Sequence, residues 1–169
     1  MQYTNLDELV YYPQTVINSL LTSQKIIDLL ADKENASISD IEDEGGNLRY
    51  IFDYEHVDET VQEAAAYICI DLIADDLVNS SVISYALMIH VIVHRHFMKL
   101  DKRIFKGMPG NRRDNLLRFI DNIVNGMKIG IGRAELDGIK KITLPSYFTG
   151  RTLVYQLSDF NRRGQKANI

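Results

Sequence analysis

The first strong pattern of apolar and polar positions in the chain is helical. Pro13 stands where a first helical turn tolerates proline, and the segment that it opens, PQTVINSLLTSQKIIDLLADK, spaces most apolar residues three or four apart. The spacing slips at Thr22 and Ser23, and Ser23 is a residue type that can cap a second helix. The pattern therefore predicts either one bent helix or two helices in succession.

A second helical pattern follows residue 111. Asn111 can cap this helix, and Asp114 would lie near its positive end. One apolar stripe then follows at helical spacing: Leu116, Leu117, Ile120, Ile123 and Val124. Gly126 is expected to end the helix.

Between these segments the period changes from helical to alternating. From Ser84 to Phe97 every second residue is apolar, broken only at Arg95, which predicts a long half-buried strand. A helix over the same residues would be apolar all round, and the β-branched content also disfavours it. The opposite face of this strand carries His90, His94 and His96 together with less uniformly apolar residues.

Shorter alternating segments predict further strands. They lie near Arg49 to Tyr54, near Tyr67 to Leu72, around Ile129 and Ile131, around Ile142 and Leu144, and from Leu153 to Leu157. The order of elements predicts an α+β fold, a single domain over residues 1–161 in which helices pack on a largely antiparallel sheet. An acidic surface loop is expected at about 32–48, and a mobile basic tail at 162–169.

Composition is consistent with a globular domain. The 169 residues are 46% hydrophobic and 25% charged, and no apolar run reaches the roughly 20 residues of a membrane helix. We therefore expect no membrane span. The acidic amino end lacks the features of a signal peptide, so the protein is expected to work in the cytoplasm where it is made. The single cysteine, Cys69, is expected to be a small core residue.

The net charge of −4 conceals an uneven distribution. Residues 1–79 hold 17 Asp and Glu against three Lys and Arg, giving −14, whereas residues 80–169 hold six against 16, giving +10. Opposite patches on identical subunits attract each other when symmetry aligns them, so self-assembly is the first hypothesis. Alternatively, the two halves interleave in space and their charges average out.

The histidine cluster HVIVHRH raises the question of a metal site. On a strand His94 and His96 would be near neighbours on one face, and on a helix His90 and His94 would share a face, so either reading permits metal binding. No HExxH pattern accompanies them, and Met88 and Ile92 lie on the same strand face. We expect no metal or other cofactor and no enzyme activity; a metal-dependent hydrolase that uses these histidines is the alternative from another functional class.

Other motifs that carry chemistry are incomplete. The run from Asp40 begins like a calcium loop but has Ile51 where the bidentate glutamate is required. The segment GMPG resembles a nucleic-acid-binding loop, and basic residues surround it, but Pro109 removes an amide donor. A small nucleic-acid-binding module remains open as a minor alternative, and phosphate or an acidic protein surface could also bind this basic loop.

Four segments of the chain together resemble a known family. They are VINSLLTSQKIIDLLAD, SYALMIHVIVHRH, NRRDNLLRFIDNIVNG and GIGRAELDGIKKITLPSYFTGRTLVYQLSDF. In this order they are similar to the tail-terminator and head-to-tail joining (neck) proteins of long-tailed bacteriophages and of phage-like contractile particles. The stretch from Asp32 to Asp58 is longer and more acidic than in that family, so another neck component, such as a head-closure or connector-docking protein, is an alternative.

The resemblance implies a structural virion protein of the phage neck, assembled in the cytoplasm of the host bacterium. Such a subunit forms a homo-oligomer, commonly a hexameric ring, that caps the tail tube protein and joins the tail to the head connector, with DNA only as cargo in the channel. On this reading three groups of residues are candidates for the interfaces. They are the acidic loop (Asp40, Glu42, Asp43, Glu44), the basic loop (Lys99, Lys102, Arg103, Lys106, Arg112, Arg113) and the histidine face (His90, His94, His96). Replacing Arg112 and Arg113 by Glu is expected to impair assembly without unfolding the monomer.

Overall fold

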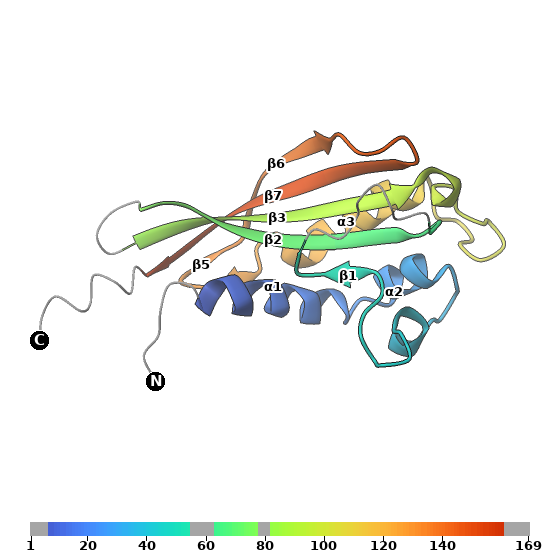
Figure 1. Ribbon diagram of the computed structural model, residues 1–169, viewed down its shortest axis with the longest axis horizontal. Coiled ribbons are helices and arrows are strands. Elements are labelled where there is room, and N and C mark those ends of the chain that lie inside the picture. The colour runs from blue at the N-terminus through green and yellow to red at the C-terminus, as the bar shows by residue number, and fades with distance from the viewer. Residues whose placement is uncertain (1–6, 55–62, 78–81, 161–169) are drawn as a thin grey trace, which may run out of the picture.

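The computed structural model describes residues 7–54, 63–77 and 82–160 (Figure 1). Its helices are α1 (Asp7–Leu20), α2 (Gln24–Ala31) and α3 (Arg112–Val124), with short 3-10 helices η1 (Ile38–Ile41) and η2 (Arg95–Phe97). Its strands are β1 (Ile51–Phe52), β2 (Ala66–Leu77), β3 (Val82–His94), β4 (Lys128–Ile129), β5 (Gly132–Arg133), β6 (Glu135–Ile142) and β7 (Phe148–Phe160). The tail expected at 162–169 lies outside the described residues.

One sheet dominates the fold. Its strand order is β1-β2-β3-β7-β6, and among the described strands only β1 and β2 pair in parallel. A separate two-stranded sheet joins β4 to β5. The predicted fold class, a single α+β domain with a largely antiparallel sheet, is confirmed. None of the helices in the described ranges is both long and apolar enough to cross a membrane.

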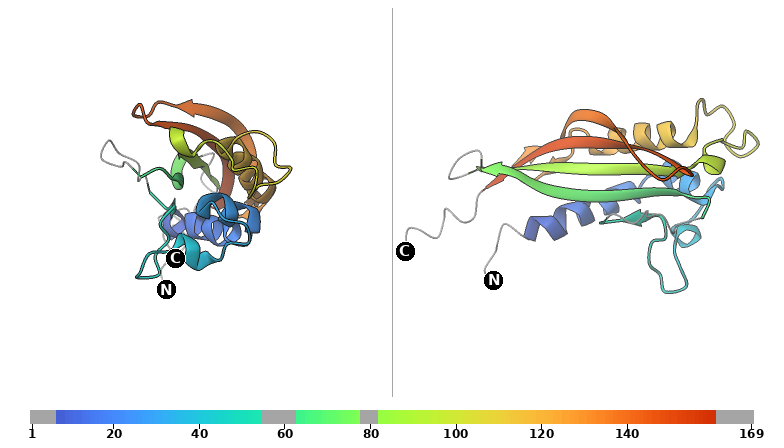
Figure 2. Two further views of the ribbon diagram at one scale, coloured as in Figure 1. Left: turned by 90° about the vertical axis from the view of Figure 1, so that its right-hand side faces the viewer. Right: turned by 45° about the horizontal axis from the view of Figure 1, so that its top comes forward.

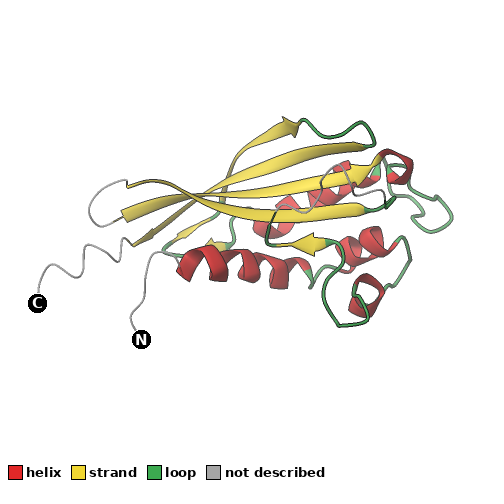
Figure 3. Ribbon diagram, in the orientation of Figure 1, coloured by secondary structure: helices red, strands yellow, loops and turns green. Residues whose placement is uncertain are grey.

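The helices cover one face of the main sheet (Figures 2 and 3). α1 packs on β2, and α3 packs on β3 and β7. The helix-facing side of β3 is the buried set that the alternation predicted: Tyr85, Leu87, Ile89, Val91 and Val93. The opposite side holds a smaller apolar cluster around Tyr67, Cys69, Ile92 and Phe148, so the prediction of a buried Cys69 is confirmed.

At the amino end the alternative of two successive helices is confirmed. α1 nevertheless begins at Asp7, so Pro13 lies inside the helix and not in its first turn. Ser23 precedes α2 in an extended conformation, as an N-cap residue does, but its side chain makes no capping hydrogen bond. α3 begins as predicted, because the Asn111 side chain accepts a hydrogen bond from the Asp114 backbone N–H.

Three strand ends differ from the sequence prediction. β3 stops at His94, where the His94 side chain accepts a hydrogen bond from the His96 backbone N–H and the chain turns into η2. β6 stops at Ile142, so Leu144 lies in the connection to β7, before the turn that follows Pro145. β4 ends at Ile129, and Gly130 turns the chain with a positive φ of 67°, which leaves Ile131 outside the strands. Side-chain capping at His94 and turn geometry at the other two points ended the strands, although the apolar alternation continued in the sequence.

Two tyrosines, the buried Tyr155 and the partly buried Tyr12, join the sheet to the helices. The Tyr155 hydroxyl on β7 donates a hydrogen bond to the Asp121 carboxylate on α3 (3.0 Å), and the Tyr12 hydroxyl on α1 donates one to Asp159 on β7. Burial, followed by the hydrogen bond to the carboxylate, raises the pKa of both tyrosines, and burial raises the pKa of Tyr67 to about 12. These hydroxyl groups therefore hold their protons more tightly in the folded state than in the unfolded chain.

Alkaline pH is expected to destabilise the fold through these tyrosines. Their contribution is complete below the unfolded pKa of 10.0 and is lost as the pH rises above it, because the unfolded chain then releases protons that the folded state retains. The urea concentration at the midpoint of unfolding should therefore be lower at about pH 11 than at about pH 9. Tyr155→Phe should lower stability at both pH values but make the fall between them smaller, and an equal fall in the two proteins would contradict this role of Tyr155.

Candidate assembly surfaces

The acidic and basic halves of the chain lie at opposite edges of the sheet. β1 and β2, with α1 and α2, come from residues 1–79, and the strands from β3 onward come from residues 80–169. Since the strand order is β1-β2-β3-β7-β6, the boundary between the halves is also a boundary across the sheet. In Figure 1 β1 lies on one side of the β2–β3 pair and β7 and β6 lie on the other, whereas α3 and β5 lie on the same side of the sheet as α1. The strands of the two halves are therefore separated within the sheet, whereas on its helix-covered face the halves interleave, because α3 packs against both α1 and α2.

Part of the acidic loop is held in local structure. Asp40 accepts hydrogen bonds from the Ser37 backbone N–H (2.7 Å) and from Lys33 (2.9 Å), and these bonds, that from Lys33 foremost, lower the pKa of Asp40 to about 2. Asp43 closes a turn by accepting hydrogen bonds from Asn47 and Gly45, which lowers the pKa of its carboxyl group. Both remain negative at neutral pH.

Glu42 and Glu44 complete the acidic loop. Glu42 forms an isolated β-bridge with Leu48 and is partly exposed, whereas Glu44 is exposed. All four acidic candidates thus lie on one ordered segment, since hydrogen bonds within the loop hold its backbone.

Arg112 is buried, and its expected place in an exposed basic patch is wrong. Its side chain is only 1% exposed and donates hydrogen bonds to the carbonyl groups of Leu29 and Phe97 and to the Asp32 carboxylate. Its guanidinium carbon also lies 3.8 Å from the centre of the Phe97 ring. Leu29 is in the last turn of α2, where carbonyl groups lack helical partners, so Arg112 caps a helix distant in sequence. Replacing it by Glu is therefore expected to destabilise the monomer, contrary to the expectation from sequence.

The rest of the basic loop divides into bonded and exposed side chains. Arg113 is largely buried, donates a hydrogen bond to the Thr149 hydroxyl (2.7 Å) and pairs with Asp114. Arg103 is 90% exposed and pairs with Asp101 at 2.6 Å. Lys99, Lys102 and Lys106 are exposed. The surface charge of this loop therefore comes from its three lysines and Arg103, not from the two arginines that begin α3.

The three histidines do not form one row on a strand. His90 and His94 lie on β3 and face away from the helices, but His96 lies in η2, so the expectation that His96 belongs to the same strand face is wrong. His94 lies four positions after His90, which corresponds to about 13 Å along a strand. His90 contacts the Thr152 hydroxyl at 2.7 Å, whereas the rings of His94 and His96 meet at 5.1 Å.

Around His94 the structure forms an aromatic recess. Its ring stacks on Tyr147 and meets the edge of Phe148, and burial followed by the charge of His96 lowers the His94 pKa. Ala64, His94, His96 and Tyr147 line a hollow of about 370 Å³. Within the described ranges, no three metal-ligating side chains of the types His, Cys, Asp and Glu converge, so His90, His94 and His96 do not together form a metal centre.

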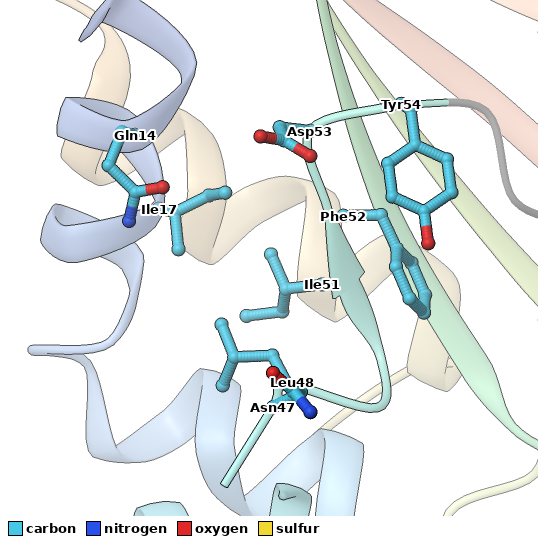
Figure 4. A pocket seen from close by; sticks show the side chains of 8 residues that line it. All are labelled: Gln14, Ile17, Asn47, Leu48, Ile51, Phe52, Asp53 and Tyr54. Atoms are coloured by element: carbon cyan, nitrogen blue, oxygen red, sulfur yellow. The ribbon is translucent and has the colours of Figure 1, made fainter. Parts of the chain in front are cut away.

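A groove that the sequence did not reveal lies between α1 and β1. Its volume is about 510 Å³, and it is lined by Gln14, Ile17, Asn47, Leu48, Ile51, Phe52, Asp53 and Tyr54. Figure 4 shows Ile17 and Ile51 approaching each other across its floor, with Asp53 on the α1 side of the strand. The groove has an apolar floor and a carboxylate at its rim, and it lies at the acidic edge of the sheet.

The opposite edge strand, β6, is exposed and basic at its carboxyl end. Ile139 is 54% exposed, and Lys140 and Lys141 beside it are exposed too. The sequence predicted a strand around Ile142 but not that it would be an edge. Lysines are common on edge strands, so the adjacent Lys140 and Lys141 are a local signal that could have identified this edge.

Most of the chain matches the model of a known protein family. That model, described as YomW, covers residues 23–157, from just before α2 into β7. No curated protein matches the chain. The match spans both edges of the main sheet and the candidate surfaces, apart from the part of α1 that lines the groove.

Proposed function

The chain belongs to the YomW family, and from that premise we propose that it is a structural protein of a phage neck, a tail terminator that caps the tail tube as a ring. YomW is the name of a phage-derived protein, which supports a phage origin. On this proposal the ring is a homo-oligomer, commonly of six subunits in proteins that this sequence resembles. It binds the tail tube protein on one side and the head connector on the other, and DNA passes through its channel.

The observation that carries the proposal is the separation of charge across the sheet. A ring of identical subunits needs two different complementary surfaces on each subunit, because every contact is made head to tail. The acidic loop and Asp53 beside β1, and Lys140 and Lys141 at the carboxyl end of β6, place opposite charges at the two edges of one sheet and meet that requirement; Glu135 and Asp137 lie nearer the start of β6. Binding energy then holds subunits together, and the proposal includes no catalytic step.

The proposal predicts that the purified protein stops the growth of tail tubes. When it is added to polymerising tail tube protein from the same genome, negative-stain images should show rings at tube ends and shorter tubes. Because exposed charges contribute to the contacts, ring formation should weaken as salt increases.

Bovine serum albumin at equal concentration is the control for nonspecific effects on polymerisation. Unchanged tube lengths and bare tube ends would overturn the assignment as tail terminator. Binding to the head connector without binding to the tube would identify a different neck component, such as a head-closure protein.

A further inference from the structure

The two edges of the main sheet are open in the described part of the chain. β1 pairs only with β2, and β6 pairs only with β7. The Tyr50 carbonyl accepts a hydrogen bond from the Ile68 N–H (2.8 Å), so the next backbone groups along the strand, those of Ile51, point away from β2. Open edges of this kind accept an added strand through main-chain hydrogen bonds.

The side chains beside these edges are complementary. At the acidic edge, the groove between α1 and β1 offers an apolar floor of Ile17 and Ile51 below the exposed Asp53 carboxylate (Figure 4). At the basic edge, the exposed Ile139 and Lys141 are two residues apart, and so they lie on one face of β6. An apolar side chain with a cation beside it matches an apolar groove with an anion beside it.

The register of the sheet places both sets on the same face. Ile51 pairs with Ile68, Ile68 with Val91, Val91 with Arg151 and Arg151 with Lys141, so Ile51 and Lys141 occupy one row. Ile139, two residues before Lys141 on β6, pairs with Leu153. Leu153 belongs to the main hydrophobic core, which lies between the sheet and the helices. Ile139 therefore projects from the helix-covered side of the sheet, the side on which α1 and β1 enclose the groove.

The strand directions also allow β6 of one subunit to pair with β1 of another. β6 is antiparallel to β7, β7 and β2 are each antiparallel to β3, and β2 is parallel to β1. If a second copy continues the sheet, its β6 lies antiparallel to β1. When the row is also continued, its Lys141 falls beside Ile51, and its Ile139 falls beside Asp53.

We infer that β6 of one subunit adds to β1 of the next, with Ile139 beside Asp53 at the groove between α1 and β1, and with Lys141 beside Ile51, from which its ammonium group pairs diagonally with the Asp53 carboxylate. The occupant of the groove is thus a second copy of this chain. This inference rests on the proposed function, because it describes the contact that repeats around the ring. The contact is heterologous, so each subunit uses its groove once and its β6 edge once.

Self-association measured by sedimentation velocity tests this contact. Ile139→Asp should raise the dissociation constant about tenfold or more, because it places a charge against an apolar floor beside Asp53. Ile131→Asp is the matched control, since Ile131 is also exposed (42%) but lies between β4 and β5, on neither edge strand of the main sheet. Equal effects of the two substitutions would overturn the inference.

A charge exchange tests the pairing itself. Asp53→Lys alone and Lys141→Glu alone should each weaken self-association, because each places like charges together. An equimolar mixture of these two variants should associate again, since both kinds of contact in an alternating ring then join opposite charges. Failure of the mixture to associate, when each variant is folded by circular dichroism, would overturn the pairing of Lys141 with Asp53.

Disulfide cross-linking provides a measurement that does not require stable rings. A mixture of Asp53→Cys chains and Ile139→Cys chains should form a linked dimer under mild oxidation, because directly opposed residues on paired strands have the separation that a disulfide needs. Ile131→Cys in place of Ile139→Cys should give no such dimer. Equal yields from the two mixtures would overturn the contact.

These outcomes separate the inference from the proposed function. If rings cap tail tubes and Ile139→Asp rings cap them equally well, the contact is wrong and the function stands. If the contact forms in solution but the protein ignores tail tubes, the function as a terminator is wrong and the contact stands. A wild-type chain that neither self-associates nor gives the cross-linked dimer overturns the contact.

Discussion

Arg112→Ala is expected to lower the free energy of unfolding by about 3–5 kcal/mol, the largest effect that we expect of a single substitution in this protein. The substitution leaves the carbonyl groups of Leu29 and Phe97 without their donor and removes the cation that pairs with Asp32. It also empties a buried volume beside the Phe97 and Phe105 rings. Chemical denaturation followed by circular dichroism measures the change.

Two further variants identify the cause of the loss. Arg112→Lys retains the positive charge but not the planar fork of donors, so it should recover only part of the stability. Arg103→Ala, at an exposed side chain of the same basic loop, should leave the denaturation midpoint unchanged. If Arg112→Ala behaved like Arg103→Ala, Arg112 would not connect α2, η2 and α3 as the structure shows.

Gly130→Ala is expected to destabilise the protein by about 2–4 kcal/mol, through a combination of backbone strain and steric overlap. Gly130 has a φ of +67°, a backbone conformation that residues other than glycine rarely adopt. An added Cβ would lie 2.8 Å from the backbone oxygen of Ser158 and 2.9 Å from the hydroxyl oxygen of Tyr12. It would therefore disturb the hydrogen bond between Tyr12 and Asp159, which joins α1 to β7.

Gly126→Ala is the matched control for this substitution. Gly126 also has a positive φ, +83°, but an added Cβ would meet nothing within 4 Å. Gly126→Ala should therefore lower the free energy of unfolding only by the backbone strain, about 1 kcal/mol. The difference between the two denaturation midpoints measures the steric effect. Equal midpoints would show that the atoms near Gly130 move away from an added Cβ without loss of stability.

The prediction from sequence succeeded where short-range spacing decides the structure. The two amino-terminal helices, the Asn111 cap and the buried face of β3 all follow from residues within a few positions of one another. It failed where the apolar alternation continued past the end of a strand, as at His96. There a hydrogen bond of the turn ended the strand, and the sequence pattern gave no sign of it.

The candidate surfaces show the same division. The sequence identified the charged loops, but Arg112 carries a charge and lies in the core, since its acceptors include residues 83 and 80 positions away. The groove between α1 and β1 could not be predicted either, because its two walls are joined only by tertiary packing. The charge of a side chain is known from its type, whereas its exposure depends on which distant segments cover it.

The sequence by itself determined the α+β class, the positions of the helices and main strands, and the opposite charges of the two halves, because periodicity and composition are properties of contiguous residues. Only the tertiary structure decided that those halves lie at opposite edges of one sheet, that β1 and β6 are its open edges, and that Arg112 is buried. The physical reason is that strand order and burial follow from pairings between residues far apart in the chain, such as His90 with Thr152, for which no local spacing supplies a signal.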